Sequence, residues 1–248
     1  LKKVRQEIDY RFEDFKKIIL PGITHWQSPR FFAYFPANNS EPSILAELLV
    51  AALGVQGMKW ITSPAATELE EVVMDWLKQM TLLPEEFSGV IQDTASVSTL
   101  CAILAAREKT TGLYSNRQGL KENLLRIYCS EEAHSSIEKA VRIAGIGSDN
   151  LVKIAVDPLN RMIPDKLEEH IERDITRGFQ PSCIVAALGT TGTCSIDPIH
   201  EIGQIAQKWH LWMHVDAAFA GTALILPEFR ATIQGLEYAD SIVINPHK

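Results

Sequence analysis

The sequence predicts an α/β fold in which a mostly parallel sheet lies between layers of helices. From about residue 63 onward, short runs that are almost continuously apolar alternate with longer segments of helical periodicity. Strands of that kind are buried on both faces, as in parallel sheets, and their alternation with helices is typical of this fold class. The 248 residues, 46% of them hydrophobic, suffice for one large core.

An N-terminal segment of different character comes first. Residues 9–20 have the spacing of an amphipathic helix, and the stretch PGITHWQSPRFFAYFP at 21–36 is extended and rich in aromatic side chains. We therefore divide the chain into an N-terminal segment, 1–40, and a large domain, 41–248.

The first helix of the large domain is predicted at 63–80. Ser63 is a good N-cap, and Pro64 suits the first helical position. One side of this helix is apolar, so we expect it to pack in the core; its residues are Leu69, Val73, Trp76 and Met80.

The remaining elements alternate along the chain. Strands are predicted at 89–92, 124–130, 150–156, 182–189, 211–216 and 240–245, and helices at 93–109, 131–145, 164–178 and 199–210. The chain opens without a methionine and stops directly after the last strand, so we expect a fragment of a longer protein.

Composition and motifs argue against several functions. A net charge of −7 disfavours a nucleic-acid partner, and no apolar run reaches the ~18 residues that a membrane span needs. HEIGQ at 200–204 lacks the second histidine of the HExxH zinc motif, and we expect no metal site. The four cysteines form no CxxC pair, which is typical of reduced thiols in a cytoplasmic protein.

Polar residues follow the predicted strands at the edge where open parallel sheets bind ligands. A helix start with free N–H groups could hold a phosphate there. An imidazole, a carboxylate and an amine follow other strands at the same edge. The residues concerned are Thr94, Ala95 and Ser96, then His134, Asp216 and Lys248.

Each of these residues also has an ordinary explanation. The segment 94–96 could merely cap a helix, a single histidine could be structural, Asp216 could pair with an arginine, and Lys248 could be a solvated charge. Their placement on one edge favours a joint role, because a buried carboxylate needs a cation. An amine, an anion and phosphate donors are the groups that hold pyridoxal 5'-phosphate (PLP).

The same residues lie in motifs of a known family. The segments TAS, EEAHSS, GTTGTCSID, HVDAAFAG and NPHK closely resemble those of the PLP-dependent group II decarboxylases, specifically the aromatic-L-amino-acid decarboxylases. The similarity runs from about Asp9 to Lys248. It implies the PLP-binding large domain of the aspartate-aminotransferase type (fold type I), a dimer-packing N-terminal arm, a homodimer, and a C-terminal small domain beyond Lys248.

The resemblance also implies roles for single residues. Lys248 would bind the cofactor covalently, Asp216 would pair with its ring nitrogen, and His134 would stack on its ring. The phosphate and the walls of the cofactor site would be contacted by Thr94, Ala95, Ser96, Thr191, Ala218, Asn245 and His247. The substrate would lie against His134 and the aromatic stretch, with Trp26, Tyr34, Phe35 and Pro36, although FFAYF could instead be core.

The implied activity is that of a carboxy-lyase, which converts an aromatic L-amino acid into its amine and carbon dioxide. Asp216 as an anion would keep the ring nitrogen protonated, so that the cofactor accepts the electrons left by the departing carbon dioxide. Two alternatives stay open. One is an aldehyde synthase, which adds oxidative loss of the amine and differs in a loop residue after Lys248; the other is a non-catalytic PLP-fold fragment.

Overall fold

The computed structural model describes residues 10–35, 39–120 and 124–248. Contacts within the chain divide it into two units, Leu1–Ile44 with His247–Lys248, and Leu45–Pro246. Pro36, which the resemblance assigns to the substrate pocket, lies outside the described residues. Within the described ranges, none of the helices combines the length and apolar character that a membrane span requires.

The second unit is built on a five-stranded sheet. Its strands are β1 (Leu125–Ser130), β2 (Leu151–Ile154), β3 (Gln180–Ala187), β4 (Trp212–Ala217) and β5 (Ser241–Ile244), in the order β2-β1-β3-β4-β5. Every neighbouring pair is parallel. Successive side chains point to opposite faces, and both faces are apolar, so each face needs its own cover.

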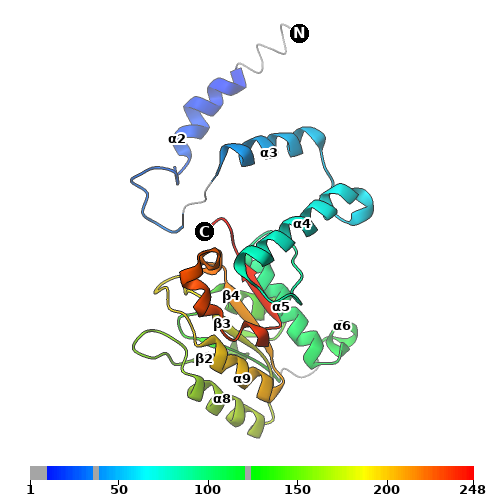
Figure 1. Ribbon diagram of the computed structural model, residues 1–248, viewed down its shortest axis with the longest axis vertical. Coiled ribbons are helices and arrows are strands. Elements are labelled where there is room, and N and C mark those ends of the chain that lie inside the picture. The colour runs from blue at the N-terminus through cyan, green and yellow to red at the C-terminus, as the bar shows by residue number, and fades with distance from the viewer. Residues whose placement is uncertain (1–9, 36–38, 121–123) are drawn as a thin grey trace. The chain divides into compact units, whose positions relative to one another are not determined.

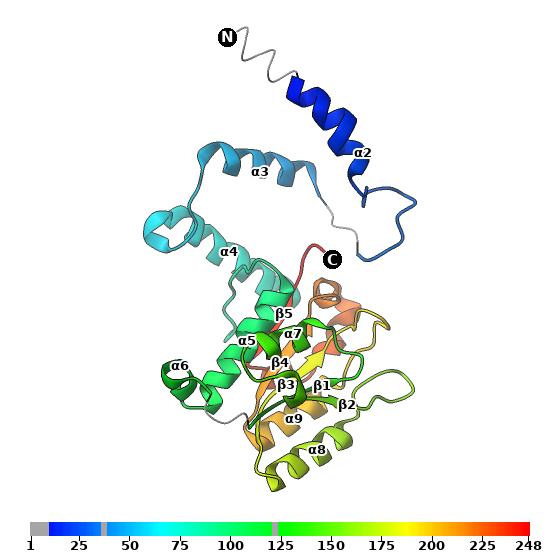
Figure 2. The same cartoon turned by 180° about the vertical axis from the view of Figure 1, so that it is seen from behind.

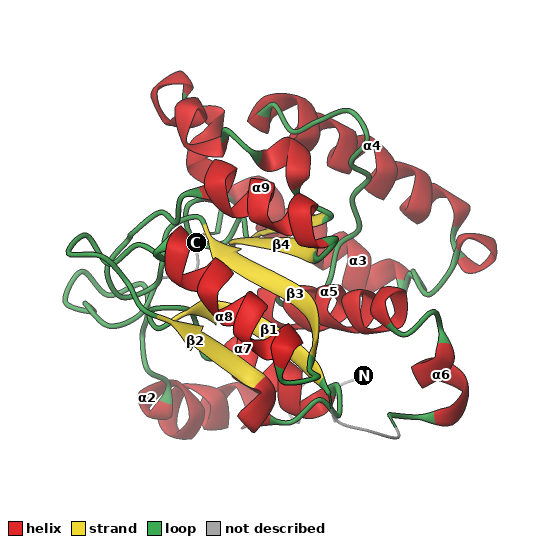
Figure 3. Cartoon of the chain, turned by 90° about the horizontal axis from the view of Figure 1, so that it is seen from below, coloured by secondary structure: helices red, strands yellow, loops and turns green. Residues whose placement is uncertain are grey.

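Helices supply that cover on both sides. α8 (Pro164–Thr176) and α9 (Ile199–Trp209) pack on the face that contains Tyr128 and Ile184, in front of the strands in Figure 1. α5 (Ala95–Thr110) and α7 (Ser136–Ile143) pack on the face that contains Ile127, Cys129 and Val185, as the opposite view in Figure 2 shows. Figure 3 separates the yellow strands from the red helices around them. The predicted parallel α/β architecture is confirmed.

The other helical segments are short or lie in the N-terminal third of the chain. They are α2 (Leu20–Gly22), α3 (Glu41–Leu53), α4 (Pro64–Thr81) and α6 (Tyr114–Gln118), a π-helical turn at Phe15–Ile19, and 3₁₀ turns at Trp60–Thr62, Ser148–Asn150, Gly221–Ile225, Pro227–Ile233 and Leu236–Tyr238. The backbone is helical over 10–22, in agreement with the helix predicted at 9–20, and residues 23–35 form turns and bends.

The strand predicted at 89–92 is wrong. Residues 87–92 have no regular secondary structure, and the side chains of Val90 and Ile91 are 65% and 62% exposed. The N–H of Ile91 donates to Glu70 Oε1 on α4 at 2.7 Å instead of to a neighbouring strand. A run of only four apolar residues is too short to distinguish a strand from a connecting segment.

The core packing predicted for the apolar side of α4 is wrong for three of its four residues in the single chain, whereas Val73 is half-buried. Leu69, Trp76 and Met80 are 63%, 57% and 44% exposed, and Val72 on the same side is 45% exposed. Helical periodicity establishes that one side is apolar, but it does not establish what covers that side. In this chain the stripe formed by Leu69, Val72, Trp76 and Met80 faces solvent.

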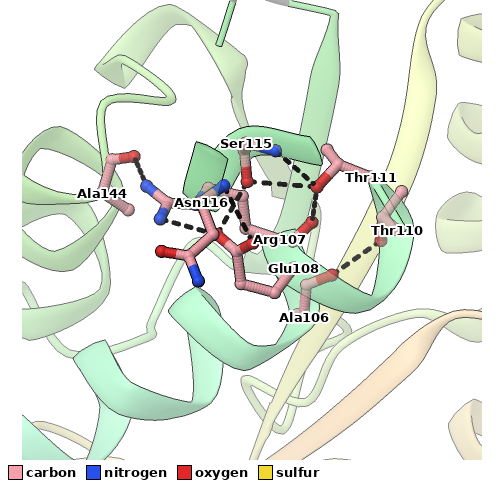
Figure 4. Close-up of polar contacts among 8 residues, drawn as sticks. All are labelled: Ala106, Arg107, Glu108, Thr110, Thr111, Ser115, Asn116 and Ala144. Carbon is pink, nitrogen blue, oxygen red and sulfur yellow. Dashed lines mark hydrogen bonds and ion pairs between the residues drawn. The ribbon is translucent and has the colours of Figure 1, made fainter. Parts of the chain in front are cut away.

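A polar cluster joins the carboxyl ends of α5 and α7 (Figure 4). Arg107 on α5 donates to the carbonyl oxygen of Ala144, directly after α7, at 2.7 Å, and its guanidinium pairs with Glu108 at 2.8 Å. The Glu108 carboxylate accepts the Ser115 hydroxyl at 2.7 Å and the Asn116 N–H at 3.1 Å. The bond from Ser115 is the main reason that the pKa of Glu108 lies below its ordinary value. The cluster therefore fastens the two helices to each other.

Candidate functional site

The carboxyl ends of all five strands meet at one edge of the sheet, because every pair is parallel. The chain passes from β1 outward to β2, and β3, β4 and β5 then continue on the other side of β1. Ligands of open α/β sheets bind outside the carboxyl ends of the strands where the order reverses in this way. The segments that follow β1 and β3 are therefore the expected walls of a site.

α5 points its amino end toward this edge. At its carboxyl end, the Thr110 carbonyl accepts the side chain of Gln180 at 3.3 Å, and Lys109 donates to Asp240 at 2.9 Å. Gln180 begins β3 and Asp240 directly precedes β5. Since α5 ends where the strands begin, it runs antiparallel to them and begins where they end.

The first turn of α5 has free donors. Thr94 is the N-cap, and its Oγ1 accepts the N–H of Val97 at 3.2 Å. The N–H groups of Ala95 and Ser96 have no acceptor within the part of the chain that the structure describes. A helix amino terminus with unsatisfied N–H groups favours an anion such as a phosphate.

His134 lies between β1 and α7, with its ring orientation fixed. Its Nδ1 accepts the N–H of Ser136 at 3.2 Å and lies 2.9 Å from the hydroxyl of the same residue. A backbone N–H can only donate, so Nδ1 carries no proton, and the neutral ring has its proton on Nε2. The side chain is exposed at the edge where a stacking residue was predicted.

Asp216 is the next-to-last residue of β4 and is half-buried. Its Oδ1 accepts the N–H of Ala218 at 3.1 Å, and no other hydrogen bond to this carboxylate comes from the described residues. Ala218 itself is buried. Asp216 thus presents a second carboxylate oxygen that can accept a ligand N–H.

The segments after β3 and β4 and the carboxyl end of β5 approach each other so closely that glycine is required at two positions. Gly189 has φ +86°, and a Cβ there would lie 2.6 Å from the Cβ of Ala220. A Cβ on Gly221 would lie 2.8 Å from Ile244 Cγ1. Ordinary side chains at these positions would push the three segments apart.

Asp197 was missed by the sequence reasoning, although it organises the loop after β3. It is 1% exposed, and its carboxylate accepts the N–H of Ala187 at 2.8 Å and that of Met162 at 2.7 Å. Burial raises the pKa of Asp197 despite these two donors. No spacing rule marks such a residue, because its partners are backbone groups 10 and 35 positions away.

Three hydroxyl groups contact one another within the same loop, which carries Thr191 at its tip. Thr190 Oγ1 lies 2.7 Å from Thr193 Oγ1 and 2.8 Å from Ser195 Oγ, and the last two are 3.0 Å apart. Thr191 is exposed at the tip of the loop. Thr191, which was predicted to line the cofactor site, thus lies in a loop that is held together by contacts among its own hydroxyl groups.

His214 received no role from the sequence reasoning. It is 1% exposed, and its Nδ1 lies 2.9 Å from Ser241 Oγ. Burial lowers its pKa to about 4. The alternation of strand residues is the signal that could have found it, because His214 and Asp216 are two positions apart and so share a face of β4.

The other predicted site residues divide between the two units. Asn245 directly follows β5 in the second unit, whereas His247 and Lys248 belong to the first unit with the aromatic stretch. The Lys248 ammonium lies over the ring of Phe35, 5.4 Å from its centre. Trp26 stacks on Tyr34 with ring centres 5.5 Å apart and planes at 12°. The lysine and these predicted pocket residues are therefore parts of one unit.

The residues present fit PLP by their chemistry. The free N–H groups at the start of α5 suit a phosphate, the available oxygen of Asp216 suits a protonated ring nitrogen, and Lys248 supplies an amine for the cofactor aldehyde. Over the described ranges, no cluster of three histidine, cysteine or acidic residues could hold a metal ion.

Comparisons with known proteins agree with this chemistry. Residues 2–248 match the pyridoxal-dependent decarboxylase conserved domain. The chain is 48% identical to the aromatic-L-amino-acid decarboxylase of Bos taurus, over 95% of this chain and 50% of that protein. It is 43% identical to the phenylacetaldehyde synthase of Arabidopsis thaliana, over 98% and 51%.

A solved structure is similar over the same region. The crystal structure of Catharanthus roseus tryptophan decarboxylase in complex with L-tryptophan has a TM-score of 0.90 at 41% identity, and the match covers 97% of this chain and 53% of that one. The chain spans about half the length of the curated relatives that it matches. The predicted large-domain fold of type I is confirmed. The chain belongs to the pyridoxal-dependent decarboxylase family.

Proposed function

We propose that the protein is a PLP-dependent carboxy-lyase, which converts an aromatic L-amino acid into the corresponding amine and carbon dioxide. The observation that carries this proposal is the set of groups at the carboxyl edge of the sheet. There, the half-buried carboxylate of Asp216 keeps an oxygen available, and α5 begins with two unsatisfied N–H groups. An anion for a ring nitrogen and donors for a phosphate are thus offered together.

Bound PLP supplies a ring that accepts the electron pair released when a carboxylate leaves as carbon dioxide. The part played by Asp216 is electrostatic: its negative charge holds a proton on the ring nitrogen and makes the ring a better electron acceptor. Ala95 and Ser96 bind the phosphate through their N–H groups and so fix the position of the ring. Lys248 would hold the cofactor through its side-chain amine.

His134 would orient the substrate from the face of the ring. Because Ser136 occupies Nδ1, the proton on Nε2 is the one that can be offered to a substrate carboxylate. A fixed donor of this kind lowers the barrier by holding the scissile bond in a reactive orientation. Trp26, Tyr34 and Phe35 present flat apolar rings that suit an aromatic side chain, which supports the choice of substrate class.

Two variants of the complete protein test this mechanism. Lys248→Ala should abolish the visible absorption of bound PLP. Asp216→Ala should lower the rate of carbon dioxide release by about 10²–10³-fold or more, because the charge that polarises the ring is lost. Asp149→Ala, which removes an exposed carboxylate before β2, is the matched control. Undiminished turnover by Asp216→Ala would overturn the mechanism, and failure of the wild-type protein to bind PLP would overturn the function.

An aldehyde synthase is the second candidate. It is favoured by the 43% identity to phenylacetaldehyde synthase, which is close to the identity with the bovine decarboxylase. The two reactions differ in their products, since the synthase also releases ammonia and hydrogen peroxide. Carbon dioxide, peroxide and ammonia should therefore be measured together for L-tryptophan, L-tyrosine, L-phenylalanine and L-dopa. Hydrogen peroxide released in an amount equal to carbon dioxide would identify the protein as an aldehyde synthase and would contradict the simple decarboxylase.

We also propose that the protein is a homodimer and that a second copy covers the apolar stripe of α4. Four large side chains, Leu69, Val72, Trp76 and Met80, are at least 44% exposed along one side of this helix. Contiguous apolar surface of this kind is uncommon on a monomer and marks interaction sites. The assembly implied by the family resemblance provides a partner of the right chemistry.

Sedimentation of the complete protein tests this assembly. Trp76→Lys places a charge in the centre of the stripe and should shift the protein from dimer to monomer. Glu71→Lys changes the charge on the opposite side of α4 and should leave the dimer intact. A wild-type monomer, or a Trp76→Lys dimer of unchanged affinity, would contradict the proposal.

The protein is proposed to act in the cytoplasm. All four cysteines, Cys101, Cys129, Cys183 and Cys194, are free thiols, which supports a reducing compartment. Immunofluorescence of the complete protein with organelle markers tests this location.

A further inference from the structure

The segment 88–93 leads the chain into the first turn of α5, and few contacts hold it in place. It has no regular secondary structure, and its large apolar side chains, Val90 and Ile91, are exposed. The N–H of Ile91 donates to Glu70 Oε1 on α4 at 2.7 Å. Over the described ranges, this is the one hydrogen bond that residues 88–93 make. The position of the segment therefore depends on Glu70.

A second contact comes from the same side of α4. Met74 follows Glu70 by four positions, so the two side chains are neighbours on the helix surface. A Cβ on Gly89 would lie 2.9 Å from the Cβ, Cγ and Sδ atoms of Met74. The backbone thus lies directly against α4 at Gly89. Two positions later it is bound by a carboxylate, and hydrogen bonds to charged acceptors are the stronger kind.

The bond to Glu70 lies close in the chain to the N–H groups that would bind the cofactor phosphate. Ile91 precedes Ala95 by four residues, which span at most about 14 Å. Thr94 is still extended, with φ −151° and ψ 158°, so the helix begins only at Ala95. Among the described residues, Glu70 therefore makes the last hydrogen bond from another element before the free N–H groups of Ala95 and Ser96.

The negative charge of Glu70 does not by itself favour a phosphate, because like charges repel. A benefit to phosphate binding must come from the hydrogen bond, which orders the turn before the ligand arrives. If only a fraction of the molecules has an ordered turn, the apparent Kd rises in inverse proportion to that fraction. Loss of the bond should therefore weaken phosphate binding, whereas loss of the charge alone should strengthen it.

We propose that Glu70 is a positioning residue for the phosphate-binding turn: its carboxylate holds the backbone at Ile91 and so keeps the N–H groups of Ala95 and Ser96 in place for the cofactor phosphate. The inference rests on the proposed PLP chemistry and adds to it a residue on α4. Glu70 acts through the backbone of the segment 88–93.

Pyridoxal, which is PLP without its phosphate, isolates the contribution of the phosphate. The complete protein, freed of cofactor, is titrated with each compound, and the Kd for pyridoxal is divided by the Kd for PLP. Glu70→Ala should lower this ratio about 10-fold, the scale of one lost charge-assisted hydrogen bond. Glu70→Gln keeps an acceptor oxygen of the same reach and should recover most of the ratio.

Glu71→Ala is the matched control. It removes a neighbouring exposed carboxylate on the same helix, whose side chain makes no hydrogen bond to any residue that the structure describes. It should keep the wild-type ratio. A ratio that rises in both Glu70→Ala and Glu70→Gln would show that only the charge of Glu70 matters, and would overturn the proposal.

Hydrogen exchange separates positioning from a general loss of stability. In the cofactor-free protein, Glu70→Ala should speed exchange over residues 88–97, and Glu70→Gln should exchange nearly as slowly as the wild type. A purely structural role would instead lower Tm, weaken PLP and pyridoxal equally and leave the ratio unchanged. That result would contradict the proposal.

The outcomes distinguish this inference from the proposed function. If the wild-type protein prefers PLP to pyridoxal and releases carbon dioxide, the function stands. In that case, a Glu70→Ala protein with the wild-type ratio and wild-type exchange over 88–97 would overturn the role of Glu70 alone. Equal binding of the two compounds by the wild type would overturn the phosphate-binding turn together with this inference. If the wild-type protein binds neither compound, the function itself falls.

Discussion

Replacement of Gly189 by alanine tests whether the close contact between the loops after β3 and β4 shapes the cofactor site. Gly189 has φ +86°, and a Cβ would approach Ala220 Cβ to 2.6 Å. Gly178 is the matched control: its φ is +83°, and nothing lies within 4 Å of the Cβ that alanine would add. The two variants therefore share backbone strain and differ in the steric contact.

The expected loss in the free energy of unfolding follows from the backbone strain and the steric contact. Alanine in the left-handed region costs about 1–2 kcal/mol, and this is the full destabilisation expected for Gly178→Ala. In Gly189→Ala the overpacked contact adds about 1–3 kcal/mol, so the total is about 2–5 kcal/mol. Because the displaced loops carry Thr191 and Ala218, only Gly189→Ala should also weaken PLP binding.

Urea unfolding of both variants and fluorescence titration of the apoproteins with PLP provide the measurements. Gly189→Ala should unfold at clearly lower urea than Gly178→Ala, with a raised Kd for PLP. Equal losses of stability in the two variants, together with equal PLP affinity, would refute the reasoning that loop contact requires glycine at this position.

Three further outcomes are expected. Asp197→Ala removes the acceptor of two buried backbone N–H groups and should reduce the free energy of unfolding by about 2–6 kcal/mol in urea titrations, since each such group costs about 1–3 kcal/mol when unpaired; an unaffected midpoint would contradict this role. The pKa of His214 falls from 6.5 to about 4 on folding, so stability is full above pH 6.5 and is lost as the pH drops toward 4, by up to about 3 kcal/mol. Urea unfolding at pH 7.5 and 4.5 should show this loss in the wild type and a smaller one in His214→Gln. Arg107→Ala should speed amide hydrogen exchange at the carboxyl end of α7. Exchange identical to that of the wild type would show that the bond from Arg107 to Ala144 in Figure 4 does not stabilise this end of the helix.

The parallel sheet could be predicted because its strands are apolar over most of their length. β1, β3, β4 and β5 lie within a residue or two of the predicted ranges, and β2 lies inside its range. At 89–92 the same rule failed, because local hydrophobicity does not reveal whether a neighbouring strand is available. The 3₁₀ turns between β4 and β5 have no periodic pattern, so no rule of spacing could indicate them.

The site could be predicted as far as it depends on strand ends and local motifs. Thr94 is the N-cap of α5, and Asp216 lies at the carboxyl end of β4, as the sequence indicated. Asp197, by contrast, acts through backbone groups brought to it by the fold. The contacts that Trp212 and His214 make with Ser241 Oγ join β4 to β5, and only the strand order makes those residues neighbours.

The clamp between Arg107 and Ala144 has a consequence for how this protein could diversify. With their far ends tied, α5 and α7 cannot drift apart, so the first turn of α5 and the loop bearing His134 keep a constant spacing. New chemistry on the substrate side must then arise in segments outside the clamp. The aromatic region around Trp26, Tyr34 and Phe35 is free to change in this sense, and relatives with different amino-acid preferences should differ there before they differ at Arg107.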